Sequence, residues 1–256
     1  MEGLPGDPVR RRGHRAGSRP EDLLSGPRRL VLLRHGRTGD NASGRIQGQL
    51  DTPLDDVGRA QAAAVAPVLA GAAPALVVTS DLARALDTAA PLAAAAGLTP
   101  VLDPRLRELD LGAWQGLTSE QARQLFPTEH EAWRRGEDVP RGNGETYADA
   151  GRRAAASLAD HLTGVPAGGT LVAVTHGGTA RAALGVLLDL PPAAWPRLSP
   201  LGNTCWTVLV EGDVGWRLER HNAGLGPLVG AATGAHDLGS TPVGGVTASP
   251  DVEPVR

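Results

Sequence analysis

The chain of 256 residues contains no lysine, and all 25 of its basic residues are arginine. This absence excludes enzymes that form a lysine Schiff base with a carbonyl group, and it excludes a nucleotide-binding loop with a P-loop lysine. Arginine keeps its charge and presents forked donors that fit the oxygens of phosphate or carboxylate. The sequence therefore excludes two large classes of enzyme but allows binding of a small anion through arginine.

Cysteine is nearly absent as well, since Cys205 is the only one in the chain. A single thiol cannot form an internal disulfide, which suits a reducing compartment. The sequence also contains no Cys/His cluster and no acidic run with the spacing of metal ligands. We therefore expect a cytoplasmic protein that needs neither a metal nor another cofactor.

Long apolar runs and an excess of basic charge are also missing. No apolar run approaches the roughly 18 residues of a membrane span, and the N-terminus lacks the apolar stretch of a secretion signal. The net charge is −3 and the sequence pI is about 6.2. These features predict no membrane partner and no nucleic-acid partner.

The signatures of several hydrolase classes are absent. A cysteine phosphatase needs an arginine six positions after its cysteine, but Glu211 stands six positions after Cys205. The chain has no Asp-x-Asp pair for an aspartyl nucleophile and no Gly-x-Ser-x-Gly motif for a serine hydrolase. Any hydrolytic chemistry must therefore use another nucleophile.

What is present is an alternation of short apolar strings and alanine-rich segments, which predicts strands and helices respectively. The predicted strands are Arg29–Leu33, Ala75–Thr79, Thr99–Leu102, Thr170–Thr175, Thr204–Val210 and Gly215–Arg220. The predicted helices are Val57–Leu69, Leu82–Ala96, Ser119–Leu125, Thr128–Arg135, Thr146–Leu162 and Thr179–Leu188. Strands that alternate with helices imply crossover connections, so we expect an α/β fold, a three-layer α/β/α sandwich with a mainly parallel central sheet.

The two ends of the chain lack this periodicity. Residues 1–28 and 224–256 are rich in glycine and proline and contain few apolar residues that could offset the entropy of ordering. We expect a disordered N-terminal extension, one domain over residues 29–223 and a disordered C-terminal tail.

Polar residues follow three of the predicted strands, at the edge where parallel sheets bind ligands. Arg34 and His35 follow the first strand, Arg84 lies one turn into the helix after the second, and His176 follows the fourth. A further extended segment leads to Glu108. If these strands are neighbours, two guanidinium groups, two imidazoles and a carboxylate share one crevice. Such a pocket fits a phosphate dianion.

This set of residues suits cleavage of a phosphate ester. A neutral imidazole is a good nucleophile, and we expect His35 to fill that role because Gly36 would let the backbone approach the ligand and Arg34 would orient it. Glu108 is the candidate proton donor to the leaving oxygen, provided that burial and the phosphate charge keep it protonated. His176 could donate to a non-bridging oxygen.

Each of these residues also has an ordinary structural interpretation. A histidine at a strand end is commonly a hydrogen-bonded structural residue, Arg84 alone would be a surface charge of a helix, and Glu108 alone a solvated loop carboxylate. Only their joint position at strand ends favours a site. The remaining histidines are expected on the surface or in the ends: His14, His130, His161, His221 and His236.

Several ordered motifs resemble those of the histidine phosphatase superfamily, which has the phosphoglycerate mutase-like fold. They extend from Arg29 to Asn222 and are LVLLRHGRTGDN, GRIQGQLDTPLDDVGRAQA, VTSDLARALDTA, LRELDLGAWQGLT, GNGET and VTHGG. The resemblance implies that His35 is the phosphorylated histidine and Glu108 the proton donor. It also implies that the phosphate is held by Arg34, Arg84 and His176, and that the pocket is lined by Asn41, Gln47 and Gly177.

Within the superfamily, the segments AAWPRLSPLGNTCW and WRLERHN resemble the actinobacterial glucosyl-3-phosphoglycerate phosphatases. That resemblance implies a small phosphorylated metabolite as substrate, with Arg45 and Arg141 at the rim of the pocket. Arg37 departs from the Glu or Gln usual after the glycine, and His176-Gly177-Gly178 departs from the His-Gly-Asn of mutases.

Two alternatives stay open at this stage. One is a phosphoglycerate mutase-type phosphoryl transfer, and the other is a non-catalytic domain that only binds phosphate. A homodimer is compatible with the apolar residues near the C-terminal end of the domain, which would serve equally well as core: Trp195, Leu198, Leu201 and Trp206.

Overall fold

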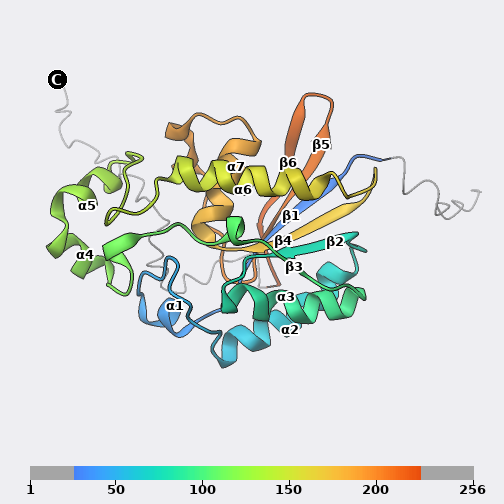
Figure 1. Ribbon diagram of the computed structural model, residues 1–256, viewed down its shortest axis with the longest axis horizontal. Helices are drawn as coiled ribbons and strands as arrows, with labels where there is room; N and C mark the ends of the chain where they lie inside the picture. The colour runs from blue at the N-terminus through green and yellow to red at the C-terminus, as the bar shows by residue number, and fades with distance from the viewer. Residues whose placement is uncertain (1–25, 226–256) are drawn as a thin grey trace, which may run out of the picture.

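The structure is a computed structural model that describes residues 26–225 (Figure 1). The predicted extension and tail lie almost wholly outside the described residues. Arg28, which the prediction placed in the extension, donates to both carboxylate oxygens of Glu211 at 2.7 and 2.6 Å and to the carbonyl of Leu162 at 2.8 Å. The folded part of the chain therefore includes Arg28.

Six strands form one sheet in the order β3-β2-β4-β1-β5-β6. The four strands β3, β2, β4 and β1 pair in parallel with one another, whereas β5 pairs antiparallel with both β1 and β6. The strands are β1 Arg29–Arg34, β2 Leu76–Thr79, β3 Val101–Leu102, β4 Thr170–Thr175, β5 Trp206–Gly212 and β6 Gly215–Ala223. The predicted α/β class with a mainly parallel centre is confirmed.

Helices cover both faces of the sheet, as Figure 1 shows with α6 and α7 on one side and α2 and α3 on the other. The α-helices are α1 Gly39–Ser43, α2 Asp56–Ala70, α3 Ala83–Ala96, α4 Ser119–Leu125, α5 Pro127–Arg134, α6 Tyr147–Leu162 and α7 Gly177–Leu187. The 3₁₀ helices are η2 Pro104–Leu106, η3 Gly112–Trp114 and η4 Pro192–Arg197.

The alternation of side chains along the central strands explains the two layers. In β1, Leu30 and Leu32 belong to the core cluster with α6 and α7, whereas Val31 and Leu33 belong to the cluster with α2 and α3. Because successive side chains of a strand point to opposite faces, an uninterrupted apolar string fills both clusters. A strand that is apolar throughout Leu30 to Leu33 is therefore suited to the centre of a sheet that is covered on both faces.

A third hydrophobic cluster lies outside the two layers, where α4 and α5 pack beside the sheet (Figure 1). Trp114 is fully buried there and lies against His130, with ring centroids 5.8 Å apart, and His130 is also 5.3 Å from the ring of Trp133. The prediction that His130 is a surface residue is therefore wrong, because two tryptophan rings enclose it.

The apolar residues considered for a homodimer interface belong to the core. Trp195 and Leu201 are buried, and Leu198 and Trp206 pack against core clusters while partly buried. The homodimer remains a prediction, without these side chains to support it. Within residues 26–225, no helix combines the length and the apolar character that crossing a bilayer requires.

Candidate active site

The register of two parallel strands brings the two histidines together. Arg34 at the end of β1 pairs with Thr175 at the end of β4, and the amide of His35 donates to the carbonyl of Thr175 at 3.0 Å. The next residue of each strand is a histidine, so the rings of His35 and His176 lie with their centroids 5.1 Å apart. Both are buried, with exposed fractions of 2% and 0%. The ends of β1 and β4 therefore lie side by side, as the sequence predicted.

The tautomer of His35 is set by its own backbone neighbour. Nδ1 lies 2.7 Å from the carbonyl oxygen of Gly36. A carbonyl oxygen can only accept, so Nδ1 carries the proton and Nε2 keeps its lone pair. Burial, followed by the positive charges of Arg84 and Arg34, holds the pKa of His35 well below its usual value of 6.5. His35 is therefore a neutral imidazole with Nε2 able to attack.

Gly36 allows close packing of the main chain. A Cβ atom on Gly36 would lie 2.5 Å from the carbonyl oxygen of Gly58, at the start of α2, and a Cβ on Gly58 would lie 2.0 Å from the carbonyl oxygen of Arg37. Two glycines facing each other thus let α2 approach the turn after β1. The expectation that Gly36 also lets the backbone approach a ligand remains a prediction.

Arg84 is fully buried and uses all three of its nitrogen donors within the protein. Nη1 donates to the carbonyl of Leu50 at 2.6 Å, Nη2 to that of Gly48 at 2.7 Å, and Nε to Nδ1 of His176 at 3.2 Å. Burial lowers the pKa of Arg84 to about 10 despite the opposing charges of Glu108 and Asp51. The guanidinium is thus fixed in position beside both histidines.

His176 is held between Arg84 and Ser80. Its Nε2 lies 2.9 Å from the hydroxyl oxygen of Ser80, which is fully buried after β2. Burial and the charge of Arg84 hold the pKa of His176 well below 6.5. Ser80 directly follows β2, so the end of a third strand contributes to the same cluster.

Arg34 supplies a second guanidinium at the same place. Its side chain is 6% exposed, and Nη1 donates to the carbonyl of Leu201 at 2.6 Å. Its charge adds to burial and to the charge of Arg84 in holding the pKa values of His35 and His176 below 6.5. Two cations therefore surround two neutral imidazoles.

The carboxylate of Glu108 lies at the N-terminus of α7. It accepts from the amide of Gly178 at 3.0 Å, from the amide of Thr179 at 2.8 Å and from the hydroxyl of Thr179 at 3.1 Å. A Cβ atom on Gly178 would lie 2.8 Å from Oε1 of Glu108. α7 begins directly after His176, so the same short segment positions both the imidazole and the carboxylate.

A residue that sequence reasoning missed holds the main chain of Glu108 in place. Arg153 on α6 donates to the carbonyl of Glu108 at 2.9 Å and to those of Arg105 and Arg107 at 2.7 and 2.8 Å. The same guanidinium is paired with Glu145 at 2.7 Å. Three carbonyl groups on one cation fix the segment that delivers Glu108.

Asn41 and Gln47 lie in one hydrogen-bond network with the turn after β1. Thr38 donates its hydroxyl to Gln47 at 2.9 Å and to Asn41 at 3.2 Å. Asn203, a residue not singled out in the sequence, donates to Oδ1 of Asn41 and to the carbonyl of His35, both at 3.1 Å. The network ties both predicted pocket residues to His35.

The predicted rim residues are less closely associated with this cluster. Arg45 is exposed, and its Nη1 donates to the carbonyl of Gly116 at 2.8 Å. Arg141 is buried, and its guanidinium carbon lies 4.9 Å from the centre of the Tyr147 ring. Gly177 is buried as the first residue of α7. Arg37, the departure from the family pattern, pairs with Asp55 at 2.8 Å.

The arrangement offers a nucleophile, a carboxyl group and two fixed cations within one buried region. Forked guanidinium groups complement the oxygens of a phosphoryl group and stabilise the charge that develops on them during transfer. In residues 26–225, no group of three or more His, Cys, Asp or Glu side chains is arranged to hold a metal ion. The positive charge at hand is that of arginine.

Known proteins share this fold and these motifs. A glucosyl-3-phosphoglycerate phosphatase of Mycobacterium tuberculosis is 42% identical over 211 residues, which are 77% of this chain and 95% of that relative. A solved structure of a mycobacterial glucosyl-3-phosphoglycerate phosphatase in complex with VO3 is 44% identical, has a TM-score of 0.73, and is matched over 77% of this chain and 100% of that chain.

A probable phosphoglycerate mutase of Yersinia enterocolitica is 42% identical over 176 residues, which are 66% of this chain and 79% of that relative. Residues 30–224 match the family described as histidine phosphatase superfamily (branch 1). That range includes all six strands of the sheet, apart from Arg29 at the start of β1, and it includes both His35 and His176. The chain therefore belongs to the histidine phosphatase superfamily, branch 1.

Proposed function

We propose that the chain is a metal-independent phosphomonoesterase that transfers a phosphoryl group to His35 and then to water. In the first step Nε2 of His35 forms a bond to phosphorus as the ester P–O bond breaks, and Glu108 gives its proton to the leaving alkoxide. Arg34 and Arg84 stabilise the transferring oxygens. The alcohol then leaves.

In the second step water attacks the phosphohistidine. Glu108, now a carboxylate, takes a proton from the water as its oxygen bonds to phosphorus and the N–P bond breaks. Inorganic phosphate leaves, and His35 returns to its neutral form with Nε2 free. Arg84 holds His176 in place by donating to its Nδ1, and the Nε2 proton, which lies toward Ser80 in the structure, would turn to an oxygen of the transferring group when the substrate binds.

A single observation carries this proposal. The proton of His35 is directed to the carbonyl of Gly36 at 2.7 Å, and the charges that lower the pKa of the ring are those of Arg84 and Arg34. The nucleophile is thus uncharged and fixed in orientation, and cations that fit its substrate lie beside it. A purely structural histidine would gain nothing from two buried cations at its side.

The substrate that we propose is a small phosphorylated metabolite, glucosyl-3-phosphoglycerate. The support comes from mycobacterial relatives with that name, 42% identical over most of the chain. The exposed guanidinium of Arg45 would face the non-phosphorylated part of such a substrate, together with Asn41 and Gln47. A cytoplasmic location and a homodimer remain predictions from the sequence.

A mutase reaction is the second candidate, because a probable phosphoglycerate mutase is as similar over a shorter part of the chain. A mutase returns the phosphoryl group from histidine to the same intermediate, whereas a phosphatase admits water. Incubation with 3-phosphoglycerate separates the two reactions: release of inorganic phosphate supports the phosphatase, and formation of the 2-isomer supports the mutase.

The substrate is tested by comparing kcat/KM over a panel of phosphomonoesters in the presence of EDTA. Glucosyl-3-phosphoglycerate, 3-phosphoglycerate and para-nitrophenyl phosphate form the minimal set. We expect the glucosylated ester to have the highest kcat/KM and EDTA to leave it unchanged. A higher kcat/KM for 3-phosphoglycerate would contradict the proposed substrate while leaving the phosphohistidine chemistry intact.

A further inference from the structure

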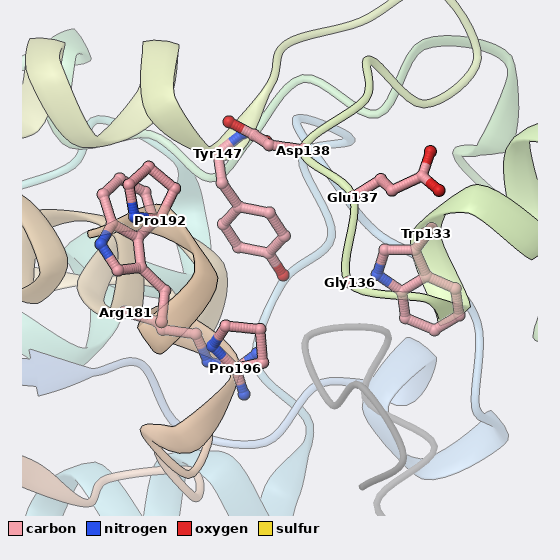
Figure 2. Close-up of a pocket in the computed structure, with 9 residues that line it drawn as sticks. Trp133, Gly136, Glu137, Asp138, Tyr147, Arg181, Pro192 and Pro196 are labelled. Atoms are coloured by element: carbon pink, nitrogen blue, oxygen red, sulfur yellow. The ribbon is translucent and has the colours of Figure 1, made fainter. Parts of the chain in front are cut away.

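A second pocket lies away from the paired histidines, between α5, the start of α6, α7 and η4 (Figure 2). Its enclosed part is small, with about 30 Å³ of room for the centres of water-sized molecules, and the pocket opens to solvent, so that its atom-free space including the open part is about 390 Å³. Its walls are largely rings, those of Trp133, Tyr147 and Trp195 together with two prolines. The pocket is lined by none of the five residues to which the proposed function gives a chemical role.

Arg181 on α7 lines this pocket as a buried cation without a partner. Its side chain is 4% exposed, its Nε atom is buried without an acceptor, and its guanidinium makes no hydrogen bond or ion pair within residues 26–225. By contrast, the buried Arg84 donates to two carbonyl groups and to His176. A buried charge without a partner is strongly unfavourable, so Arg181 calls for an anion from outside the chain.

Two further donors face the same hollow. The hydroxyl of Tyr147 and the indole nitrogen of Trp133 make no hydrogen bond to any described residue. Figure 2 shows the Tyr147 hydroxyl pointing into the space between Arg181 and Trp133. By contrast, the indole nitrogen of Trp195 is already bonded to the carbonyl of Leu190 at 2.9 Å. Three unused donors thus meet in one place.

The two carboxylates that line the pocket do not serve Arg181. Asp138 accepts from the amides of Tyr147 and Ala148 at 2.7 and 2.9 Å and so caps α6, whereas Glu137 accepts from Arg135 at 2.7 Å. Both are exposed, and Figure 2 shows them pointing away from the centre of the hollow. Their charge is screened by solvent and does not neutralise the guanidinium.

We propose that this pocket is a second ligand site, which binds a small organic carboxylate with a flat ring. A carboxylate matches a single guanidinium, because its two oxygens accept the forked donors and its one negative charge balances the one positive charge. Tyr147 and Trp133 supply further donors to the same group. The aromatic walls fit the flat face of a ring.

The residues that line this pocket differ from those given a chemical role at the paired histidines. The two sites are close, because Arg181 stands three residues after Gly178 on α7 and the amide of Gly178 donates to Glu108. A ligand in the pocket is expected to bind while the phosphate site is filled.

The test uses the full chain with vanadate in the phosphate site and benzoate as the probe. Tryptophan fluorescence reports binding, because Trp133 and Trp195 line the pocket. We expect saturable quenching by benzoate, at least tenfold weaker binding of its neutral analogue benzamide, and a loss of at least tenfold in Arg181→Met. Benzoate that is displaced by vanadate, or that binds Arg181→Met as tightly, overturns the proposal.

Two controls keep the result independent of folding and of the proposed function. Tyr147→Phe removes only the hydroxyl and should weaken benzoate binding several-fold, while unchanged binding would remove Tyr147 from the site. Without ligand, Arg181→Met should keep or raise the Tm, because it removes a buried charge that has no partner. A fall in Tm would show that the fold itself uses the guanidinium and would overturn the proposal. The fluorescence assay measures benzoate binding without any enzymatic turnover. Its result therefore tests the second site even if the proposed substrate is wrong.

Discussion

Nε of Arg84 donates a hydrogen bond to Nδ1 of His176 across 3.2 Å. A guanidinium can only donate, so Nδ1 must accept, and the proton of the neutral ring lies on Nε2, 2.9 Å from the hydroxyl oxygen of Ser80. Protonation of Nδ1 would break this contact and place two cations together. The arrangement therefore requires that His176 stay neutral while Arg84 stays charged.

Replacement of Arg84 by lysine should disable the site although the charge is kept. A single ammonium group cannot reach His176 and the carbonyls of Gly48 and Leu50 together, as the three guanidinium nitrogens do. We expect kcat/KM for para-nitrophenyl phosphate to fall by on the order of 100-fold. Arg59→Lys is the matched control, because Arg59 is exposed and contacts only Asp56 and the carbonyl of Leu54 among the described residues, near the start of α2. Equal activity of the two variants would argue against a role for the fixed guanidinium.

Replacement of Glu108 by glutamine should separate proton donation from phosphoryl transfer. An alkyl phosphate needs a proton on its leaving oxygen, so its kcat should fall by on the order of 1000-fold in Glu108→Gln. Para-nitrophenolate leaves without a proton, so hydrolysis of its ester should fall much less. Steady-state kinetics on both esters measures the difference. Equal losses on the two substrates would assign Glu108 a role other than proton donor.

Addition of one methyl group at Gly178 should displace the carboxylate of Glu108. The new Cβ atom would lie 2.8 Å from Oε1 of Glu108 and 2.8 Å from a methyl carbon of Leu109, so both side chains must move. We expect Gly178→Ala to lower kcat for alkyl phosphates by about 10- to 100-fold. Gly164→Ala is the control, because its Cβ would meet its nearest neighbour at an ordinary 3.6 Å. Full activity of Gly178→Ala would show that the position of Glu108 is not critical.

The buried histidines should make the protein less stable as the pH falls below 6.5. The pKa values of His35 and His176 in the folded protein lie well below 6.5, chiefly because of burial, and that of His130 is lowered as well. Below pH 6.5 the unfolded chain binds protons that the folded chain does not, so the unfolded state gains stability. Above pH 6.5 the histidines are neutral in both the folded and the unfolded chain, so their contribution to the free energy of unfolding is fully present.

Urea unfolding at pH 7.5, 6.5 and 5.5 measures this effect. Each neutral buried histidine should lower the free energy of unfolding by up to about 1.4 kcal/mol per pH unit in this window. His176→Gln should show a smaller slope than the wild type between pH 6.5 and 5.5. A free energy of unfolding that is constant from pH 7.5 to 5.5 would mean that these rings are protonated in the folded protein.

The strands and the central residues of the site could be predicted because they depend on local pattern and on one rule of topology. Apolar strings flanked by glycine and polar residues predict strands, and parallel strands end at the same edge of the sheet. Arg34 opposite Thr175 is a direct consequence. The helices agree to within a few residues, whereas the predicted strand Thr99–Leu102 shortens to Val101–Leu102 at the edge of the sheet.

Other features depend on contacts between segments far apart in the sequence. α1 was missed because GDNAS has no apolar periodicity, and it forms through reciprocal capping between Thr38 and Asn41 and a left-handed Gly44. Arg153 and Asn203 lie 45 and 168 positions from the carbonyl groups of Glu108 and His35 that they hold. No local sequence pattern distinguishes such residues from an ordinary surface arginine or asparagine.

The central claim is that a phosphoryl group is transferred to His35. Rapid quenching of the enzyme with a ³²P-labelled phosphomonoester, followed by gel electrophoresis at alkaline pH, tests it directly. We expect a labelled protein that loses its label in acid but not in base, and no label on a folded His35→Ala variant, whose kcat should fall by at least about 1000-fold. Appreciable turnover by His35→Ala, or a wild type that hydrolyses substrate without ever carrying an acid-labile label, would contradict the account.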